Sequence, residues 1–191
     1  MSIEGQLASE KSLSWGNILH SRGVSVMAWG RITKQACQSI LGCSTWDLYQ
    51  TILNSKEAAT RNGQLGYSVN HANIVAVMFI ACGQDAASVA ESAWSQLNLE
   101  YDRATEELCV SSDFPSLPVG TVGGGTIYDT QGESLEILGC TGPGSKCCLA
   151  GLIASFALAL DVSTTAAVTN NPFAASHYKF GRSAIGVQQK L

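Results

Sequence analysis

Two features of the chain have residue types that could take part in chemistry: a lone acid in an apolar stretch and a run of glycines. The acid is Asp85 in "FIACGQDAAS". A carboxylate in the middle of an apolar helix is costly to bury unless it is paired or protonated. Asp85 is therefore either a hydrogen-bonded structural group or an acid tuned for a site, and the residues around it leave both interpretations open.

The glycine run is "GTVGGGT", which holds Gly123, Gly124, Gly125 and Thr126. A dinucleotide-binding loop needs the spacing G-x-G-x-x-G directly after a strand, and a P-loop ends in Gly-Lys-Ser/Thr. This run has neither the spacing nor the lysine. The pattern favours a tight packing turn over a phosphate cradle, and it predicts no bound cofactor.

His177, in "NPFAASHYKFGRS", stands between a small-residue helix and a glycine-containing turn. A lone histidine is more often a hydrogen-bonded structural group than a catalyst, and His20 and His71 carry no stronger signal. No cysteine and histidine spacing supports a zinc site, and no G-x-S-x-G elbow supports a serine hydrolase. We therefore expect no metal.

The composition of the chain limits the kinds of partner and the compartment that we expect for it. Of the 191 residues, 46% are hydrophobic and 14% are charged, so some apolar surface is expected to face a partner subunit or an apolar ligand. The net charge of -4 and the lack of a basic cluster argue against nucleic acid. Seven cysteines without pairing spacings, and an N-terminus unlike a signal peptide, indicate a reduced, cytoplasmic protein. The longest apolar stretch, 149–160, is too short for a membrane span.

The order of the elements predicts an α+β fold in one domain, residues 24–183, between an N-terminal arm or loop (1–23) and a polar tail (184–191). Strands are expected over 24–32 and 106–114. Helices are expected over 34–42 after Thr33, from Ser44 or Thr45 to the break at 61–66, and over 70–97, 132–139, 142–161 and 163–176. The first half of the 70–97 helix is apolar nearly all round, which predicts burial at the centre of the fold.

Four segments together resemble a known family. In order and in spacing, "NHANIVAVMFIACGQDAAS", "FPSLPVGTVGGGT", "LEILG" and "SHYKFGRS" are similar to the second half of the catalytic domain of HMG-CoA reductases. The resemblance runs from about Lys11 to Ser183. It implies a fold like that family's large domain, built on a long buried central helix, and a pocket at the interface of a homodimer.

The resemblance also implies roles for single residues. Asp85 matches the aspartate at the centre of the family's site, and His177 matches the histidine that protonates the departing coenzyme A thiolate. Lys11, in "SEKSLSW", matches the lysine that stabilises the oxyanion. Ser12 stands where the family has a second lysine, one that binds the substrate carboxylate.

Three further positions are candidate substrate-binding residues by the same resemblance. Asn73, in "HANIV", matches a pocket asparagine, and Lys56 matches a substrate-binding lysine if a short deletion lies between them. Tyr178 follows His177 where the family has Leu or Met, and Ala175 stands where it has a polar residue. The lack of a second lysine after Lys11 and of the family's substrate-binding arginine makes us expect a substrate less acidic than a hydroxymethylglutaryl group.

The family's catalytic glutamate, its substrate-binding arginine and its nicotinamide-binding small domain match segments upstream of residue 1. Because side chains cannot supply a hydride, we expect a truncated relative that works without a cofactor. The expected function is a non-redox cyclase or isomerase of secondary metabolism, such as a pericyclase of the Diels–Alderase kind, acting on a largely apolar intermediate. The alternatives are a reductase fragment acting in trans with a second reductase-like chain, and a non-catalytic regulator or binding module.

Overall fold

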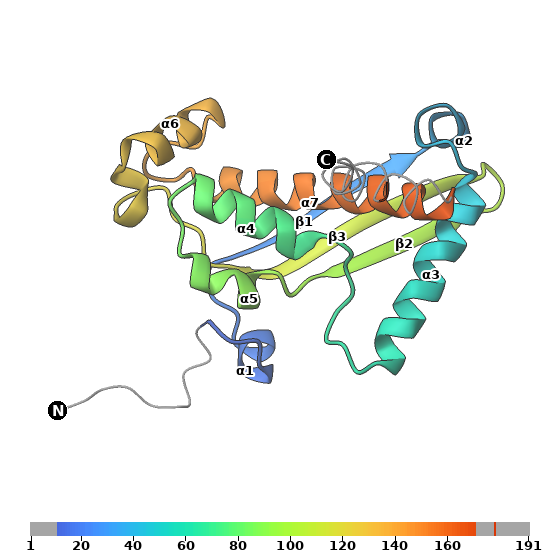
Figure 1. The fold of residues 1–191 in the computed structure, drawn as a ribbon, viewed down its shortest axis with the longest axis horizontal. Helices are drawn as coiled ribbons and strands as arrows, with labels where there is room; N and C mark the ends of the chain where they lie inside the picture. The colour runs from blue at the N-terminus through green and yellow to red at the C-terminus, as the bar shows by residue number, and fades with distance from the viewer. Residues whose placement is uncertain (1–10, 171–177, 179–191) are drawn as a thin grey trace, which may run out of the picture.

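A computed structural model describes residues 11–170 and Tyr178, and it shows three antiparallel strands with helices packed against them (Figure 1). The strands are β1 (Val24–Ile32), β2 (Gln96–Asp102) and β3 (Glu107–Leu117), in the sheet order β1-β3-β2. The long helix α7 (Lys146–Thr169) lies against β1 and β3, and α4 (His71–Ala81) packs beside α7. The described residues therefore form the α+β architecture that the sequence predicts.

Besides α4 and α7 the described residues form several further helical elements, and capping residues mark the starts of two of them. The other helical elements are α1 (Trp15–Leu19), α2 (Lys34–Ala36), the π-helical turn η1 (Cys37–Leu41), α3 (Thr45–Arg61), the 3-10 turns η2 (Ala86–Ser88) and η3 (Gly124–Ile127), α5 (Val89–Ser92) and α6 (Asp129–Ile137). The side chains of Thr33 and Ser44 accept hydrogen bonds from the first turns of α2 and α3. Gly42, the last residue of the helix expected over 34–42, follows η1 with φ of 74° and ends it in the left-handed conformation.

The strand predictions are confirmed for β1 and β3, and β2 was missed. Along β3 every second side chain is buried, including Leu108, Val110 and Phe114, which is the alternation of a strand with one face in the core. The strand continues three residues beyond its predicted end, to Leu117. β2 is an edge strand whose outward positions Asn98 and Glu100 are polar, so it contains no continuous apolar run that would have predicted it.

The predicted helix over 70–97 is wrong in its second half. α4 ends at Ala81, and the chain then turns through Gly83, which has φ of 68° and cannot continue a helix in that conformation. Asp85 starts the next turn, because its side chain accepts a hydrogen bond from the backbone N–H of Ala87. The chain becomes strand β2 from Gln96 onward.

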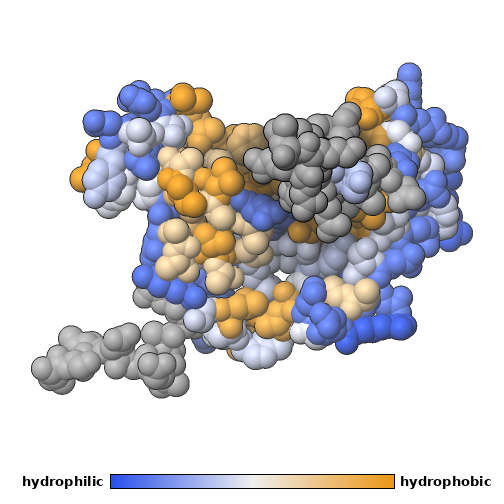
Figure 2. All heavy atoms as spheres, viewed as in Figure 1, coloured by the Kyte–Doolittle hydropathy of each residue, from blue (hydrophilic) through white to orange (hydrophobic). Residues whose placement is uncertain are grey.

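The prediction that α4 is buried all round also needs correction. His71, Val75, Met78 and Phe79 are buried, but Val77 and Ile80 are 63% and 64% exposed. Apolar side chains gather on the outward face of this part of the molecule (Figure 2). One apolar face of α4 thus packs into the core and another remains on the surface of this chain.

Two further helices differ from the expectation. The arm 1–23 was predicted as a loop, yet Ser14 caps the short helix α1 by accepting a hydrogen bond from the backbone N–H of Asn17. α7 continues to Thr169, so it joins two helices that the sequence suggested were separate. The remainder of the second predicted helix lies outside the described residues.

By length and composition alone, α7 would be able to cross a membrane. In this fold nine of its residues are buried, and the helix packs against β1, β3 and α4. Such burial is what a core helix shows, since a core helix can be as apolar as a membrane span. That the chain does not span a membrane remains a prediction.

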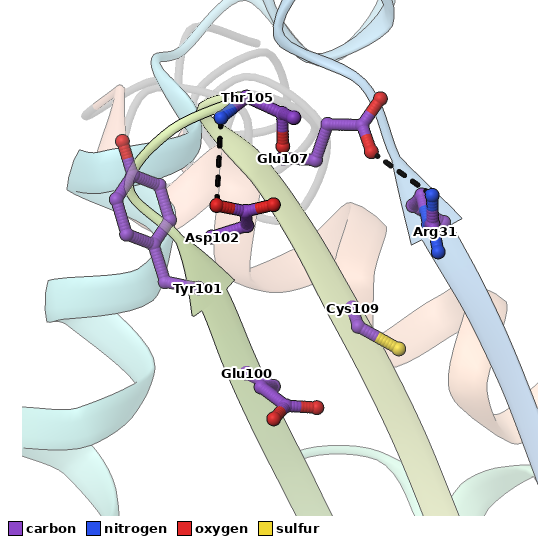
Figure 3. Close-up of a pocket in the computed structure, with 7 residues that line it drawn as sticks. All are labelled: Arg31, Glu100, Tyr101, Asp102, Thr105, Glu107 and Cys109. Atoms are coloured by element: carbon purple, nitrogen blue, oxygen red, sulfur yellow. Dashed lines mark hydrogen bonds and ion pairs between the residues drawn. The ribbon is translucent and has the colours of Figure 1, made fainter.

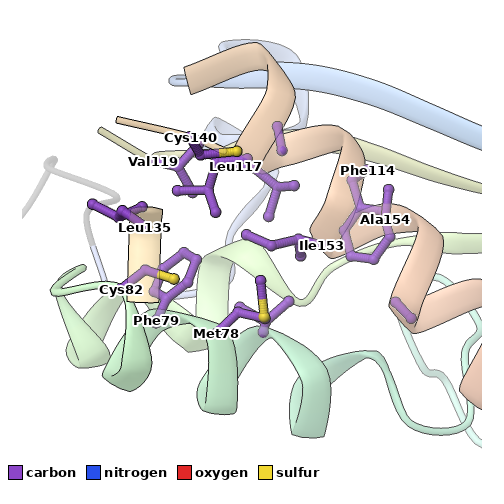
Figure 4. Packing of buried hydrophobic residues seen from close by; sticks show 14 residues of the cluster. Met78, Phe79, Cys82, Phe114, Leu117, Val119, Leu135, Cys140, Ile153 and Ala154 are labelled. Atoms are coloured by element: carbon purple, nitrogen blue, oxygen red, sulfur yellow. The ribbon is translucent and has the colours of Figure 1, made fainter. Parts of the chain in front are cut away.

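Two apolar clusters hold the helices to the sheet. The cluster shown in Figure 4 joins α4, α7 and the end of β3 through residues such as Phe79, Phe114 and Ile153. The second cluster joins α3 and α7 to β2 and β3 through residues such as Ile52 and Leu97. The first cluster includes Phe79 and Cys82, so it fixes the end of α4 from which the turn that carries Asp85 starts.

A fully buried acid, Asp161 on α7, fixes the other end of α4. Its carboxylate accepts hydrogen bonds from the backbone N–H groups of Val69 (2.9 Å) and Asn70 (2.6 Å) and lies 3.1 Å from Nε2 of His71. His71 is itself buried, stacks on Phe114 and contacts the hydroxyl of Ser112. Asp161 therefore supplies, from another helix, the acceptors for the N–H groups of the N-cap residue of α4 and of the residue before it.

We predict that Asp161→Ala lowers the free energy of unfolding by about 3 kcal/mol or more, because each buried donor left without a partner costs about 1–3 kcal/mol. Urea unfolding followed by circular dichroism measures this loss. Glu136→Ala removes an exposed acid from α6 and is the control, with an expected change within about 0.5 kcal/mol. Equal stability of the two variants would contradict the capping role of Asp161.

Candidate functional site

An ion pair joins two of the three residues that the resemblance places in the reaction. Nζ of Lys11 lies 3.1 Å from Oδ2 of Asp85, and both side chains are about half exposed, at 47% and 52%. Lys11 precedes α1, whereas Asp85 lies in the turn between α4 and η2. The fold therefore brings together two groups that lie far apart in the sequence, at a position open to a ligand.

Asp85 is not the buried helical carboxylate that the apolar stretch suggested. It lies in a turn, where the hydrogen bond from Lys11 and the one from the backbone N–H of Ala87 hold the pKa of its carboxyl below the ordinary value. Arg22 adds a weaker favourable charge. At neutral pH Asp85 is therefore ionised, which suits it to orient an ammonium group rather than to donate a proton.

The glycine run meets the Asp85 turn backbone to backbone. A methyl group on Gly83 would overlap the carbonyl group of Gly125, and one on Gly125 would overlap the carbonyl of Gly83. Gly83 also has φ of 68°, which disfavours any side chain there. These two glycines thus permit a close approach of two segments, which is the packing turn that the sequence favoured.

Gln84 holds the same two segments together, and sequence reasoning missed it. Its side-chain amide donates to the carbonyl of Gly120 and accepts from the backbone N–H of Gly120, both at 2.8 Å. Nε2 also donates to the carbonyl of Cys82, at 2.7 Å. The glutamine next to Asp85 in "GQD" was the available signal, but its partner lies in a distant loop.

Between the two segments lies an open hollow of about 320 Å³. It is lined by Gly83, Gln84, Asp85, Gly120, Val122, Gly123, Gly124, Gly125 and Thr126, so all four predicted loop residues and Asp85 share one pocket. The hydroxyl of Thr126 donates to the carbonyl of Gly123 at 2.7 Å and shapes the loop. The pocket is wide enough for a small acyl or ring group beside the Lys11–Asp85 pair.

The lining of this hollow does not fit the phosphates of a dinucleotide. None of the described residues that line it is an arginine or lysine, and Lys11 at its edge is already engaged with Asp85. Glycine backbone can lie flat against a ring, but the charged half of a nicotinamide cofactor would need cations from elsewhere. Within residues 11–170 no group of His, Cys, Asp and Glu suitable for a metal occurs.

The other predicted residues do not line this hollow. Asn73 lies in the first turn of α4, at the opposite end of that helix from Asp85, and donates to the side chain of Asn70. Lys56 lies on α3 and donates to Asn98 of β2 at 3.2 Å. Tyr178 is exposed, and His177 lies outside the described residues.

A larger hollow, of about 420 Å³, lies at the β2–β3 hairpin (Figure 3). It is lined by Arg31, Glu100, Tyr101, Asp102, Thr105, Glu107 and Cys109. Arg31 is paired with Glu107, and Asp102 accepts from the backbone N–H groups of the hairpin turn, which lowers the pKa of its carboxyl. Arg31, Glu107 and Asp102 are thus engaged within the sheet and its hairpin turn, and the resemblance places no reacting residue in this hollow, so we place the candidate site at Asp85.

Comparison with known proteins identifies relatives over nearly the whole chain. The family model for hydroxymethylglutaryl-coenzyme A reductase matches residues 1–182. The chain is 32% identical to 3-hydroxy-3-methylglutaryl-coenzyme A reductase 1 of Candida albicans and 34% identical to the reductases of Zea mays and Haloferax volcanii, with 95–96% of the chain covered. It spans 18%, 33% and 46% of the length of these three relatives.

We predict that Gly83→Ala and Gly125→Ala each separate the glycine loop from the Asp85 turn, because neither side chain has room. At Gly83 the left-handed backbone alone adds about 1–2 kcal/mol of destabilisation. Thermal unfolding and backbone amide NMR shifts of the loop measure the effect. Gly120→Ala is the control, since nothing lies within 4 Å of a methyl group there, and loop shifts equal to those of Gly120→Ala would count against a required contact.

Proposed function

Since the chain belongs to the hydroxymethylglutaryl-coenzyme A reductase family, we propose that Lys11 and Asp85 form the carbonyl-activating part of a reductase-type site. The observation that carries this proposal is the 3.1 Å contact between the two side chains beside the glycine-lined hollow. The thioester of 3-hydroxy-3-methylglutaryl-coenzyme A is the proposed substrate, as the names of the relatives suggest.

In this proposal Lys11 stabilises the negative charge that develops on the carbonyl oxygen. Its ammonium group donates a hydrogen bond to that oxygen, and such a donor is worth about 10²–10³-fold in rate. Asp85, ionised at neutral pH, keeps the ammonium charged and turned toward the hollow. The resemblance assigns proton transfer to the leaving thiolate to His177, and we retain that role as a proposal.

Reduction of a thioester also needs a hydride, which a nicotinamide cofactor supplies when bound. The described lining offers no cation for its phosphates, so we assign no step of the reaction to residues that would hold the cofactor. What residues 11–170 supply is binding, orientation and charge stabilisation at the carbonyl oxygen. In this proposal, the hydride reaches that carbonyl only when residues outside this range, or a second reductase-like chain, hold the cofactor.

A second candidate function is a cofactor-independent, non-redox reaction of a carbonyl substrate, such as isomerisation, cyclisation or a pericyclic addition. Two observations favour it. Ser12 replaces the lysine that binds a substrate carboxylate in the family, and Val122, which lines the hollow, is 65% exposed. A hollow with an apolar rim and one hydrogen-bond donor would serve a largely apolar carbonyl compound, because such reactions depend mainly on orientation.

We predict that Lys11→Met and Asp85→Asn each lower turnover by about 10²–10³-fold, because the first removes the donor to the oxyanion and the second removes the group that orients this donor. The assay follows NADPH consumption with the thioester substrate, and product formation by mass spectrometry with and without NADPH. Lys34→Met, which removes an exposed lysine paired with Glu106, is the matched control. Wild-type rates in both site variants would refute the assignment of Lys11 and Asp85.

The same assay separates the two candidate functions. Product that forms only with NADPH supports the reductase-type reaction, and product that forms equally without it supports the non-redox reaction. The pair is intact above the lowered pKa of Asp85 and is lost as the pH falls through that pKa, because protonation removes the acceptor of Lys11. The contribution of this pair to the rate should therefore be constant around neutral pH and decline only on the acid side of the ordinary aspartate range.

We further propose that the chain forms a homodimer through the outward face of α4. Val77 and Ile80 are exposed there, and Asn73 lies on the same helix at the end remote from Asp85. A second copy would be able to cover these side chains and bring its own Asn73 toward the site of the first copy. Because exposed apolar patches of this kind mark contact surfaces, the arrangement is consistent with the low charge of the chain.

We predict a dimer in light scattering at micromolar concentration, and a monomer for the double variant Val77→Asp and Ile80→Asp, since two buried carboxylates would oppose association. Ile137→Asp places a charge on an even more exposed apolar residue, on α6, and is expected to leave the dimer intact. A wild-type monomer would exclude the proposed dimer.

A further inference from the structure

A buried carboxylate, Glu91, lies beside the candidate site without belonging to its lining. It is on the short helix α5, its side chain is 0% exposed, and sequence reasoning did not single it out. Oε2 accepts hydrogen bonds from Nδ2 of Asn17 (2.8 Å) and from Nε of Arg22 (3.1 Å), and Oε1 accepts from Nη2 of Arg22. A carboxylate removed from water is stable only with such partners.

Apart from Ser88 on η2, the partners of Glu91 come from the segment that carries Lys11. Besides Asn17 and Arg22, the backbone N–H of Lys11 donates to Glu91. The hydroxyl of Ser14 donates to Oδ1 of Asn17 at 2.6 Å, which turns the amino group of Asn17 toward Glu91. One buried acid therefore holds this segment at its start, its middle and its end.

The end of the segment is also fixed to the sheet. The hydroxyl of Ser116 on β3 donates to the carbonyl of Arg22 at 2.6 Å and accepts from its backbone N–H at 3.2 Å. The next residue, Gly23, lies so close to Leu117 that any side chain would overlap the Leu117 carbonyl. The backbone of Arg22 is thus fixed to the sheet, and its side chain reaches Glu91 from that fixed position. These contacts with the sheet do not fix the residues between Lys11 and Asn17.

Asp85 and Glu91 lie on one continuous piece of chain, joined only by η2 and the first turn of α5. Asp85 holds the side chain of Lys11, and Glu91 holds its backbone N–H. Lys11 has φ of 62°, an uncommon conformation for a residue other than glycine, so its backbone needs outside contacts to stay there. An exposed ion pair alone contributes too little to fix a lysine in place.

We infer that Glu91 is a positioning residue: through Asn17, Arg22 and the backbone of Lys11 it fixes the Lys11 ammonium group beside Asp85. The inference rests on the proposed role of the Lys11–Asp85 pair in activating a carbonyl. It makes α5 part of the catalytic machinery although no atom of Glu91 reaches the hollow. Arg22 serves both carboxylates, since it pairs with Glu91 and its charge also favours the ionised form of Asp85.

The test measures the pKa of the Asp85 carboxyl by side-chain carbon NMR in the full chain. In Glu91→Ala and Glu91→Gln this pKa should rise toward its ordinary value, as in Lys11→Met, because the hydrogen bond from Lys11 is the largest cause of its depression. Asp161→Asn weakens the fold at the other end of α4 and is the control, with the pKa of Asp85 expected to stay at the wild-type value.

An unchanged Asp85 pKa in both Glu91 variants, together with lower thermal stability, would reduce Glu91 to a structural role and overturn the inference. If Glu91→Ala does not fold, Glu91→Gln decides, because the amide keeps the shape and one acceptor oxygen but loses the charge. The NMR result is independent of turnover. If the Asp85 pKa shifts in the Glu91 variants but the chain has no carbonyl-directed activity, the positioning role of Glu91 stands and the proposed function is refuted. If the Asp85 pKa stays unchanged but the chain has that activity, the proposed function stands and the positioning role is refuted.

Discussion

The positions of Gln84 and Asp85 in the candidate site depend on the contact between the backbones of Gly83 and Gly125. Because neither residue has a side chain, the turn after α4 and the loop after β3 lie against each other, and Gln84 then bonds to Gly120 across the junction. Asp85 is the next residue along the chain, so its carboxylate is placed at the mouth of the hollow by the same contact. The glycines serve here to bring two segments together, and their carbonyl groups are partly occupied in doing so. A phosphate cradle would instead need free N–H groups that converge on one point.

Local signals predicted the parts of the fold that local chemistry controls. Thr33, Gly42 and Ser44 gave the bounds of two helical segments, and alternation gave β1 and β3. The predicted helix over 70–97 failed because its break depends on Gly83 meeting Gly125, a contact between segments that no local pattern reveals. Asp85 was placed in the site by resemblance, while the physical interpretation of it as a buried helical acid was wrong for the same reason. Gln84 and Glu91 were missed because each takes its partners from a distant segment.

Asp85 and Glu91 lie six positions apart and have different roles because the first is half exposed and the second is buried. Glu91 is removed from water and is neutralised by Arg22, so desolvation and the attached hydrogen bonds make its geometry rigid. Asp85 is half exposed, and its ion pair with Lys11 is weakened by the surrounding water. The exposed pair is therefore accessible to a ligand but too weak to organise the segment by itself. The buried carboxylate provides that organisation, and the two acids together combine access with fixed geometry.

The Lys11–Asp85 pair also limits which reactions the site is able to favour. An ammonium group beside a carbonyl oxygen stabilises negative charge on that oxygen, whichever electron pair arrives at the carbon. Negative charge builds up on the carbonyl oxygen in each of three reactions: addition of a hydride, formation of an enolate, and activation of a conjugated carbonyl for cyclisation. Only the first of these needs an external reductant, and the lining of the hollow contributes none of the cations that would hold its phosphates. Under the proposed role of Lys11, the described residues would act on the carbonyl oxygen, while the source of the electrons would determine which member of this group of reactions follows.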